Sequence, residues 1–137
     1  MAKEDWLQNE IQKLAKVLAR LLRLKLAGED DKIVWEANEA LKDLPGFNDD
    51  KLIAEEIAKL LIENLQGVSQ AKAFSEIFKE KALAQERLEA MPEALKSFEI
   101  ALHLAVWADE NERVFSFESV DNIAFLREKL AAKTTDL

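Results

Sequence analysis

The apolar residues of this chain recur at steps of three and four positions, which is the spacing of one face of an α-helix. Glycine occurs 3 times and proline 2 times, too few for the turns of a multi-stranded sheet. We therefore expect an all-α fold. The pattern predicts six helices, over residues 4–27, 31–43, 50–65, 69–90, 92–108 and 120–132.

The predicted helices differ in how much of their circumference is apolar. The fifth is apolar almost all round between residues 98 and 107, which is typical of the most buried element of a fold. The second half of the fourth, residues 79–89, is weakly apolar, so we expect it to be more exposed. The first has a leucine-rich face, which we expect to be part of the core. This face consists of Leu7, Ile11, Leu14, Leu18, Leu21 and Leu22.

The short links between helices favour a single domain over residues 1–137. Helices joined in this way pack as antiparallel neighbours, so the apolar stripes are buried in a stack of hairpins or in an irregular helical bundle. Residues 109–119 are predicted to form a loop with an apolar tip at Val114, Phe115 and Phe117. Residues 133–137 are expected to be a frayed tail.

Two stretches resemble the helix pairs of tetratricopeptide repeats. Residues 24–45 contain Ala40 and Leu41 followed by Pro45, as in the small-aliphatic pair and terminal proline of the repeat. Residues 78–102 match its small and aromatic positions at Ala82, Ala94, Phe98, Ala101 and Leu102. The chain departs from the repeat at Ile33, Ala37, Gln85 and Val106, and its two units are further apart than the roughly 34 residues of adjacent repeats. The resemblance implies a TPR-like hairpin stack that binds other proteins.

The opening segment carries a second resemblance. Residues 5–22, DWLQNEIQKLAKVLARLL, are similar to the start of a family of small bacterial helical proteins of unknown function with repeat-like hairpins. That resemblance implies an all-α, cytoplasmic protein with no known activity.

The chain is acidic, with a formal net charge of −8, and the charge is unevenly distributed. Residues 1–27 hold six Lys/Arg and three Asp/Glu, whereas the remaining residues hold 13 and 24. Because an acidic protein repels phosphates, we expect no nucleic-acid partner. The longest strongly apolar uncharged stretch, residues 100–108, is far shorter than the roughly 20 residues of a membrane span.

One stripe of the first predicted helix is basic, at Lys13, Lys16, Arg20 and Arg23. The stripe either faces the acidic helices of the same domain or meets an anionic partner or membrane surface. We favour the internal interpretation, because the rest of the chain carries a large excess of acid.

No residue pattern points to catalysis or to metal binding. Cysteine is absent, which is compatible with a reducing cytoplasm. The only histidine, His103, lies in an apolar segment and is typical of a core or boundary imidazole with one hydrogen bond. Glu99 precedes it by four residues, whereas a di-iron bundle needs Glu-x-x-His pairs from two helices. We therefore expect no metal, no cofactor and no enzymatic activity.

The aromatic residues support two functional hypotheses. Phe115 and Phe117, together with the basic stripe, are the candidate partner-facing residues of a module for protein–protein interaction or self-association, for example as a homodimer. The alternative is a small-molecule-binding sensor with a pocket between helices near Trp107 and His103. Tryptophans such as Trp6 and Trp35 are more typical of core or interface anchors.

Overall fold

The computed structural model describes residues 2–135, with side chains over residues 9–132. It is all-helical, and no strand occurs in the described residues, which confirms the predicted fold class. The six helices are α1 (Ala2–Leu26), α2 (Asp30–Leu41), α3 (Ala54–Glu63), α4 (Val68–Arg87), α5 (Met91–Asn111) and α6 (Phe117–Thr135).

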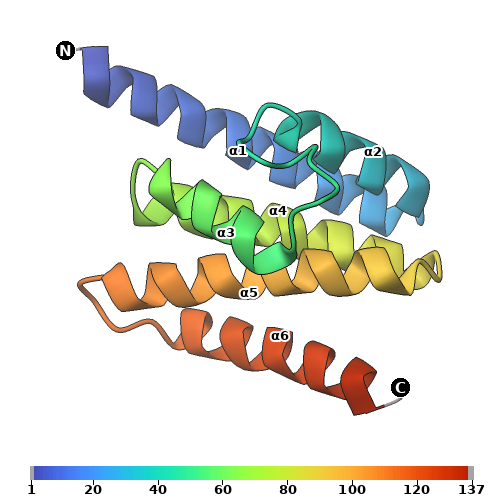
Figure 1. Cartoon of the computed structure of the whole chain (residues 1–137). Helices are drawn as coiled ribbons and strands as arrows, with labels where there is room; N and C mark the ends of the chain where they lie inside the picture. Colours follow the sequence, from blue (N-terminus) through green and yellow to red (C-terminus); the bar gives the residue numbers. More distant parts are fainter. Residues whose placement is uncertain (1, 136–137) are drawn as a thin grey trace.

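The helix pair α4–α5 forms the centre of the molecule. Figure 1 shows these two helices as an antiparallel hairpin, with α1 and α2 on one side and α6 on the other. Both α1 and α2 pack against α4, whereas α3 and α6 pack against α5. α4 faces α6 on one side, and on another side it faces α2 and the link before α3.

The core lies along the α4–α5 contact. Phe78, Phe98 and Leu104 have at most 1% of their surface exposed. Ala82 and Ala101 are fully buried, and such small side chains allow two helix backbones to approach closely. α5 is therefore buried around residues 98–107 as predicted, but it is not the most buried element, because α4 has ten buried residues and α5 has eight.

The expectation that residues 79–89 are more exposed is wrong. Ala82 and Ala84 are completely buried, and Glu80 and Gln85 are 6% and 7% exposed. The reason is tertiary, because α1, α2 and α5 all pack around this weakly apolar segment. Its polar groups are paired there: Lys25 of α1 lies 3.4 Å from Glu80, and the Ser97 hydroxyl donates a hydrogen bond to Gln85 Oε1 at 2.7 Å.

Some helix ends differ from the predicted ranges. α5 continues to Asn111 and α6 begins at Phe117, so the predicted loop 109–119 is reduced to residues 112–116. The Ser116 hydroxyl accepts a hydrogen bond from the Ser119 amide at 3.1 Å, as an N-terminal cap does. α6 runs to Thr135, so residues 133–135 of the predicted tail are helical, and residues 136–137 lie outside the described range.

Candidate functional site

An exposed aromatic pair marks the turn between α5 and α6. Phe115 and Phe117 are 68% and 78% exposed, and their rings stand edge to face with centroids 4.8 Å apart. Val114 is 74% exposed and Val120 is 42% exposed beside them. We refer to Val114, Phe115, Phe117 and Val120 as the aromatic tip. Contiguous exposed apolar groups of this kind are typical of interaction surfaces.

The packing of α6 explains why Phe117 faces solvent. α6 buries Leu126 completely in the core. Phe117 precedes Leu126 by nine residues, which places it on the opposite side of a helix with about 3.6 residues per turn. The same contact that anchors α6 therefore turns the ring of Phe117 outward.

A groove adjoins the aromatic tip, between α4, α5 and α6. Its volume is about 730 Å³. Ser116, which lies between the two phenylalanines, lines one end of it. Its charged lining consists of Lys72, Glu76, Lys79, Glu118 and Asp121. We call it the acidic groove.

Both lysines of the acidic groove are already paired. Lys72 forms an ion pair with Glu112 at the end of α5. Lys79 donates a hydrogen bond to Asn122 at 2.9 Å and lies 3.9 Å from Glu76. Its ammonium group also sits 5.1 Å from the ring centre of Phe125. The contacts of Lys79 tie α4 to α6 and that of Lys72 ties α4 to the end of α5, so both lysines of the groove are paired within the described residues.

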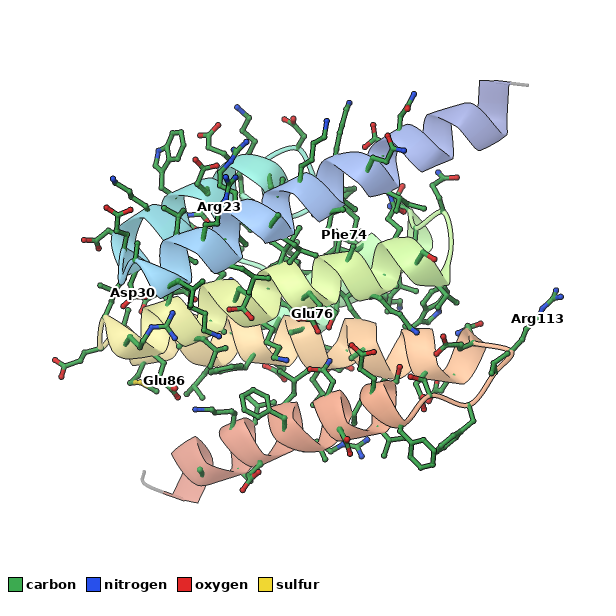
Figure 2. All side chains as sticks on the ribbon, turned by 180° about the vertical axis from the view of Figure 1, so that it is seen from behind. Arg23, Asp30, Phe74, Glu76, Glu86 and Arg113 are labelled. Atoms are coloured by element: carbon green, nitrogen blue, oxygen red, sulfur yellow. The ribbon has the colours of Figure 1, made fainter. Side chains whose placement is uncertain are left out.

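The carboxylates of the groove are less well compensated. Within the described side chains, Glu118 and Asp121 have no basic group within 4.0 Å. Burial raises the pKa of Glu76 above its ordinary value, and the neighbouring charges of Glu80 and Glu118 add to this effect despite Lys79. Figure 2 shows Glu76 on α4 and Arg113 extending away from the α5–α6 turn. The groove is therefore suited to receive a basic side chain.

The basic stripe of α1 lies on the surface. Lys13, Lys16, Arg20 and Arg23 are all exposed. Arg20 forms an ion pair with Glu36 of α2 at 2.8 Å, and Lys13 pairs with Glu10 of its own helix at 3.4 Å. Lys16 and Arg23 have no carboxylate within 4.0 Å among the described side chains. The internal interpretation thus holds for Arg20 but not for the whole stripe.

The sequence pattern also missed an apolar surface on α1. Leu22, which we assigned to the buried face, is 49% exposed, and Leu26 is 89% exposed. The apolar arc of α1 is wider than the surface that α2 and α4 cover, whereas Leu14 and Leu21 are buried. An unusually wide apolar arc on a helix is the sequence signal that points to such an excess.

The histidine and tryptophans do not form a common site. His103 and Trp107 are half-buried, and neither lines the acidic groove. The His103 ring makes no hydrogen bond with any other described residue, in contrast to the single bond that we expected. Trp35 is 61% exposed, and the side chain of Trp6 lies outside the described ones.

Two further features concern metals and membranes. Among the side chains of residues 9–132, no three His, Cys, Asp or Glu groups gather in a way that would hold a metal ion. None of the helices over residues 2–135 combines the length and apolar character needed to cross a bilayer.

Comparisons with protein-family models, with characterised proteins and with solved structures gave no match to this chain. The resemblances to tetratricopeptide hairpins and to a bacterial helical family therefore stay predictions. The exposed surfaces and the groove of the molecule are the features that bear on its function.

Proposed function

We propose that this chain is a non-enzymatic, TPR-like interaction module of the cytoplasm that binds an apolar, basic helix at its α5–α6 end. The observation that carries the proposal is the exposed ring pair of Phe115 and Phe117 beside a groove with uncompensated carboxylates. The rings offer apolar area to a partner, and the carboxylates favour a partner with basic side chains.

The electrostatics of the groove support a basic occupant. Glu76 carries a raised pKa because burial and the nearby Glu80 and Glu118 disfavour its charge. A lysine or arginine that entered the groove would stabilise that charge and lower the pKa of Glu76. Binding would therefore release a fraction of a proton and would weaken as salt concentration rises.

We propose further that the occupant is α1 of a second copy. This helix presents exposed Leu22 and Leu26 next to Arg23, which has no carboxylate within 4.0 Å among the side chains of residues 9–132. Figure 2 shows Arg23 and Arg113 toward opposite ends of the molecule. Surfaces at opposite ends that fit one another produce a head-to-tail contact rather than a two-fold symmetric one.

Sedimentation velocity over a range of protein concentrations tests this proposal. The wild-type chain is expected to increase in average mass with concentration, and less so in high salt. A tip variant, Phe115→Ser with Phe117→Ser, and an α1 variant, Leu26→Ser with Arg23→Glu, should each stay monomeric. A matched control, Ile53→Ser with Lys59→Glu, changes an exposed apolar residue and an exposed basic residue elsewhere and should behave as the wild type.

Mixing the two deficient variants sharpens the test. In a head-to-tail contact, each variant keeps one intact surface, so a mixture should form dimers and nothing larger. A wild-type chain that stays monomeric at every concentration contradicts the second copy as occupant. So does an α1 variant that still associates, because that result places the contact between two aromatic tips.

A further inference from the structure

A second cleft lies on the other side of α4, between α2, residues 42–53, α3, α4 and α5. Its volume is about 440 Å³. Three lysines line it: Lys42 is exposed, whereas Lys81 of α4 and Lys96 of α5 are partly buried. We call it the lysine cleft.

Lys81 differs from the other basic residues of α4. Lys72, Lys79 and Arg87 each have a carboxylate within 4.0 Å, at Glu112, Glu76 and Asp30. Among the described side chains, neither Lys81 nor Lys96 has such a partner. The chain contains 27 Asp and Glu residues, so the missing partner is not a shortage of acid.

The fold holds the ammonium group of Lys81 over the ring of Phe47. Its ammonium group lies 4.7 Å from the ring centre of Phe47, which in turn meets Phe78 edge to face at 6.3 Å. Gly46 makes this arrangement possible: its φ is +76°, and a Cβ at this position would lie 2.7 Å from the side chain of Leu60. The link before α3 can therefore turn tightly and lay Phe47 beneath the lysine.

Lys81 and Lys96 lower the stability of the folded chain. Burial, together with the neighbouring charge of Lys96, lowers the pKa of Lys81 to about 8. Two partly buried like charges with no counter-ion destabilise a fold. The side-chain oxygen of Asn38, which lines the same cleft, is buried without a hydrogen-bond partner. Such unsatisfied groups are rare in protein interiors, and this oxygen can accept a hydrogen bond from a molecule that enters the cleft.

We propose that the lysine cleft binds a small organic anion. Its anionic group would lie between Lys81 and Lys96, and its apolar body would pack against Phe47. A hydroxyl or amine of the ligand would donate a hydrogen bond to the side-chain oxygen of Asn38. The anionic group would give Lys81 and Lys96 a counter-ion, and the donor would give Asn38 Oδ1 a hydrogen bond, neither of which the described side chains supply.

The rim of the cleft limits the size and charge of the ligand. Glu39, Asp50 and Glu93 line the cleft and are exposed, and Glu39 pairs with Lys42 at 3.1 Å. These carboxylates repel extended polyanions such as nucleic acids. The interior adds apolar lining from Ile57, Phe78 and Ile100. A compact ligand with one anionic group and an apolar body fits both features.

The test uses three probes that separate charge from shape. Benzoate and phenyl phosphate combine an anionic group with a ring, whereas benzamide has nearly the shape of benzoate without its charge. Titrations of the full chain, followed by backbone amide NMR shifts, are expected to show at least one anion binding at residues 81, 85 and 97. Stronger binding of benzoate points to a carboxylate ligand, and stronger binding of phenyl phosphate points to a phosphate ligand.

Variants and pH provide two independent checks. Lys81→Met is expected to weaken anion binding about tenfold or more, whereas Lys59→Met, at an exposed lysine of α3, should leave it unchanged. In the wild type, benzoate binding should weaken between pH 7 and pH 9.5, because Lys81 loses its proton while the rim carboxylates stay charged. This second measurement needs no substitution.

Three results would overturn the proposal. The first is benzamide binding as tightly as benzoate. The second is Lys81→Met binding the anions as well as the wild type does. The third is that neither anion shifts the resonances of the cleft.

Discussion

The acidic groove and the lysine cleft lie on opposite sides of one helix, and they treat lysine in opposite ways. In the groove, Lys79 is held by Asn122, Glu76 and the ring of Phe125. In the cleft, Lys81 rests on Phe47 and has no carboxylate within reach among the described side chains. The two residues are two positions apart, so their different surroundings come from the elements packed on each side of α4.

The comparison separates structural cations from a candidate binding cation. A lysine that joins two helices through a carboxylate or an amide has a role within the fold. A partly buried lysine whose pKa is lowered to about 8 has no such role, and it destabilises the folded state. Perturbed groups of this kind are concentrated at functional sites. The uncompensated carboxylates of the groove are the opposite case, and they favour a basic partner.

The largest expected difference is between Phe78, which lines the lysine cleft, and Phe125, which lines the acidic groove. Phe78→Ala should cost about 3–5 kcal/mol of unfolding free energy, because this ring is buried in the core. Phe125→Ala, at a half-buried ring on the groove side, should cost about 1 kcal/mol. Urea unfolding measures both, and Phe78→Leu keeps the comparison accessible if the alanine variant does not fold. Equal losses of unfolding free energy would mean that Phe78 and Phe125 contribute equally to the stability of the fold.

The next contrast is between the two lysines. Lys81→Met should raise the free energy of unfolding at pH 7 by about 2 kcal/mol, because it removes an unpaired charge whose pKa is lowered to about 8. Lys79→Met should lower it by less than about 1 kcal/mol, since a partly exposed polar contact is lost. Urea midpoints at constant ionic strength give both values. A loss of stability in Lys81→Met would show that this lysine supports the fold.

The pH dependence follows from the same group. Lys81 has a pKa of about 8 in the folded chain, whereas the ordinary pKa of a lysine is 10.5, so the unfolded chain binds more protons between these values. Stability from this group is therefore lowest below pH 8 and recovers as pH rises toward 10.5. The advantage of Lys81→Met over the wild type should shrink by about 1–2 kcal/mol between pH 7 and pH 9.5. A constant difference over that range would contradict the lowered pKa.

The smallest effect is expected in the groove. Burial raises the pKa of Glu76 in the folded chain, so its charge is disfavoured at neutral pH and the penalty disappears as pH falls through the raised pKa. Glu76→Gln should therefore be slightly more stable than the wild type at pH 7, by less than about 1 kcal/mol because the side chain is 41% exposed. Glu99→Gln, at an exposed carboxylate of α5, is the control. Thermal unfolding at pH 4 and pH 7 should show the difference only for Glu76.

Local sequence pattern was sufficient for the helices but not for their environment. The steps of three and four residues predicted all six elements, because a repeated apolar face is a property of the helix alone. Residues 79–89 were predicted to be exposed, yet Ala84 and Gln85 are buried. Their small and polar side chains do not indicate that three other helices pack around them. Leu22 shows the converse error, since a leucine on a broad apolar face is buried only where a neighbour covers it.

The candidate sites divide in the same way. Phe115 and Phe117 were identified as a possible contact surface because they stand at the tip of a predicted turn, and they are exposed there. The basic stripe was identified as a unit, but only the arrangement of α2 selects Arg20 for an internal ion pair. The lysine cleft has no signature in the sequence, since its residues come from four helices, α2 to α5, and from the link before α3.

The sequence alone determined that this chain forms helices, where each helix lies and which turn carries exposed rings. These properties depend on neighbours within a few residues, which a linear pattern records. Only the tertiary structure decided that α4 is enclosed and that, among the described side chains, Lys79 has a carboxylate within 4.0 Å while Lys81 has none. Burial and charge compensation depend on side chains that are distant in sequence, and the packing of helices brings them together.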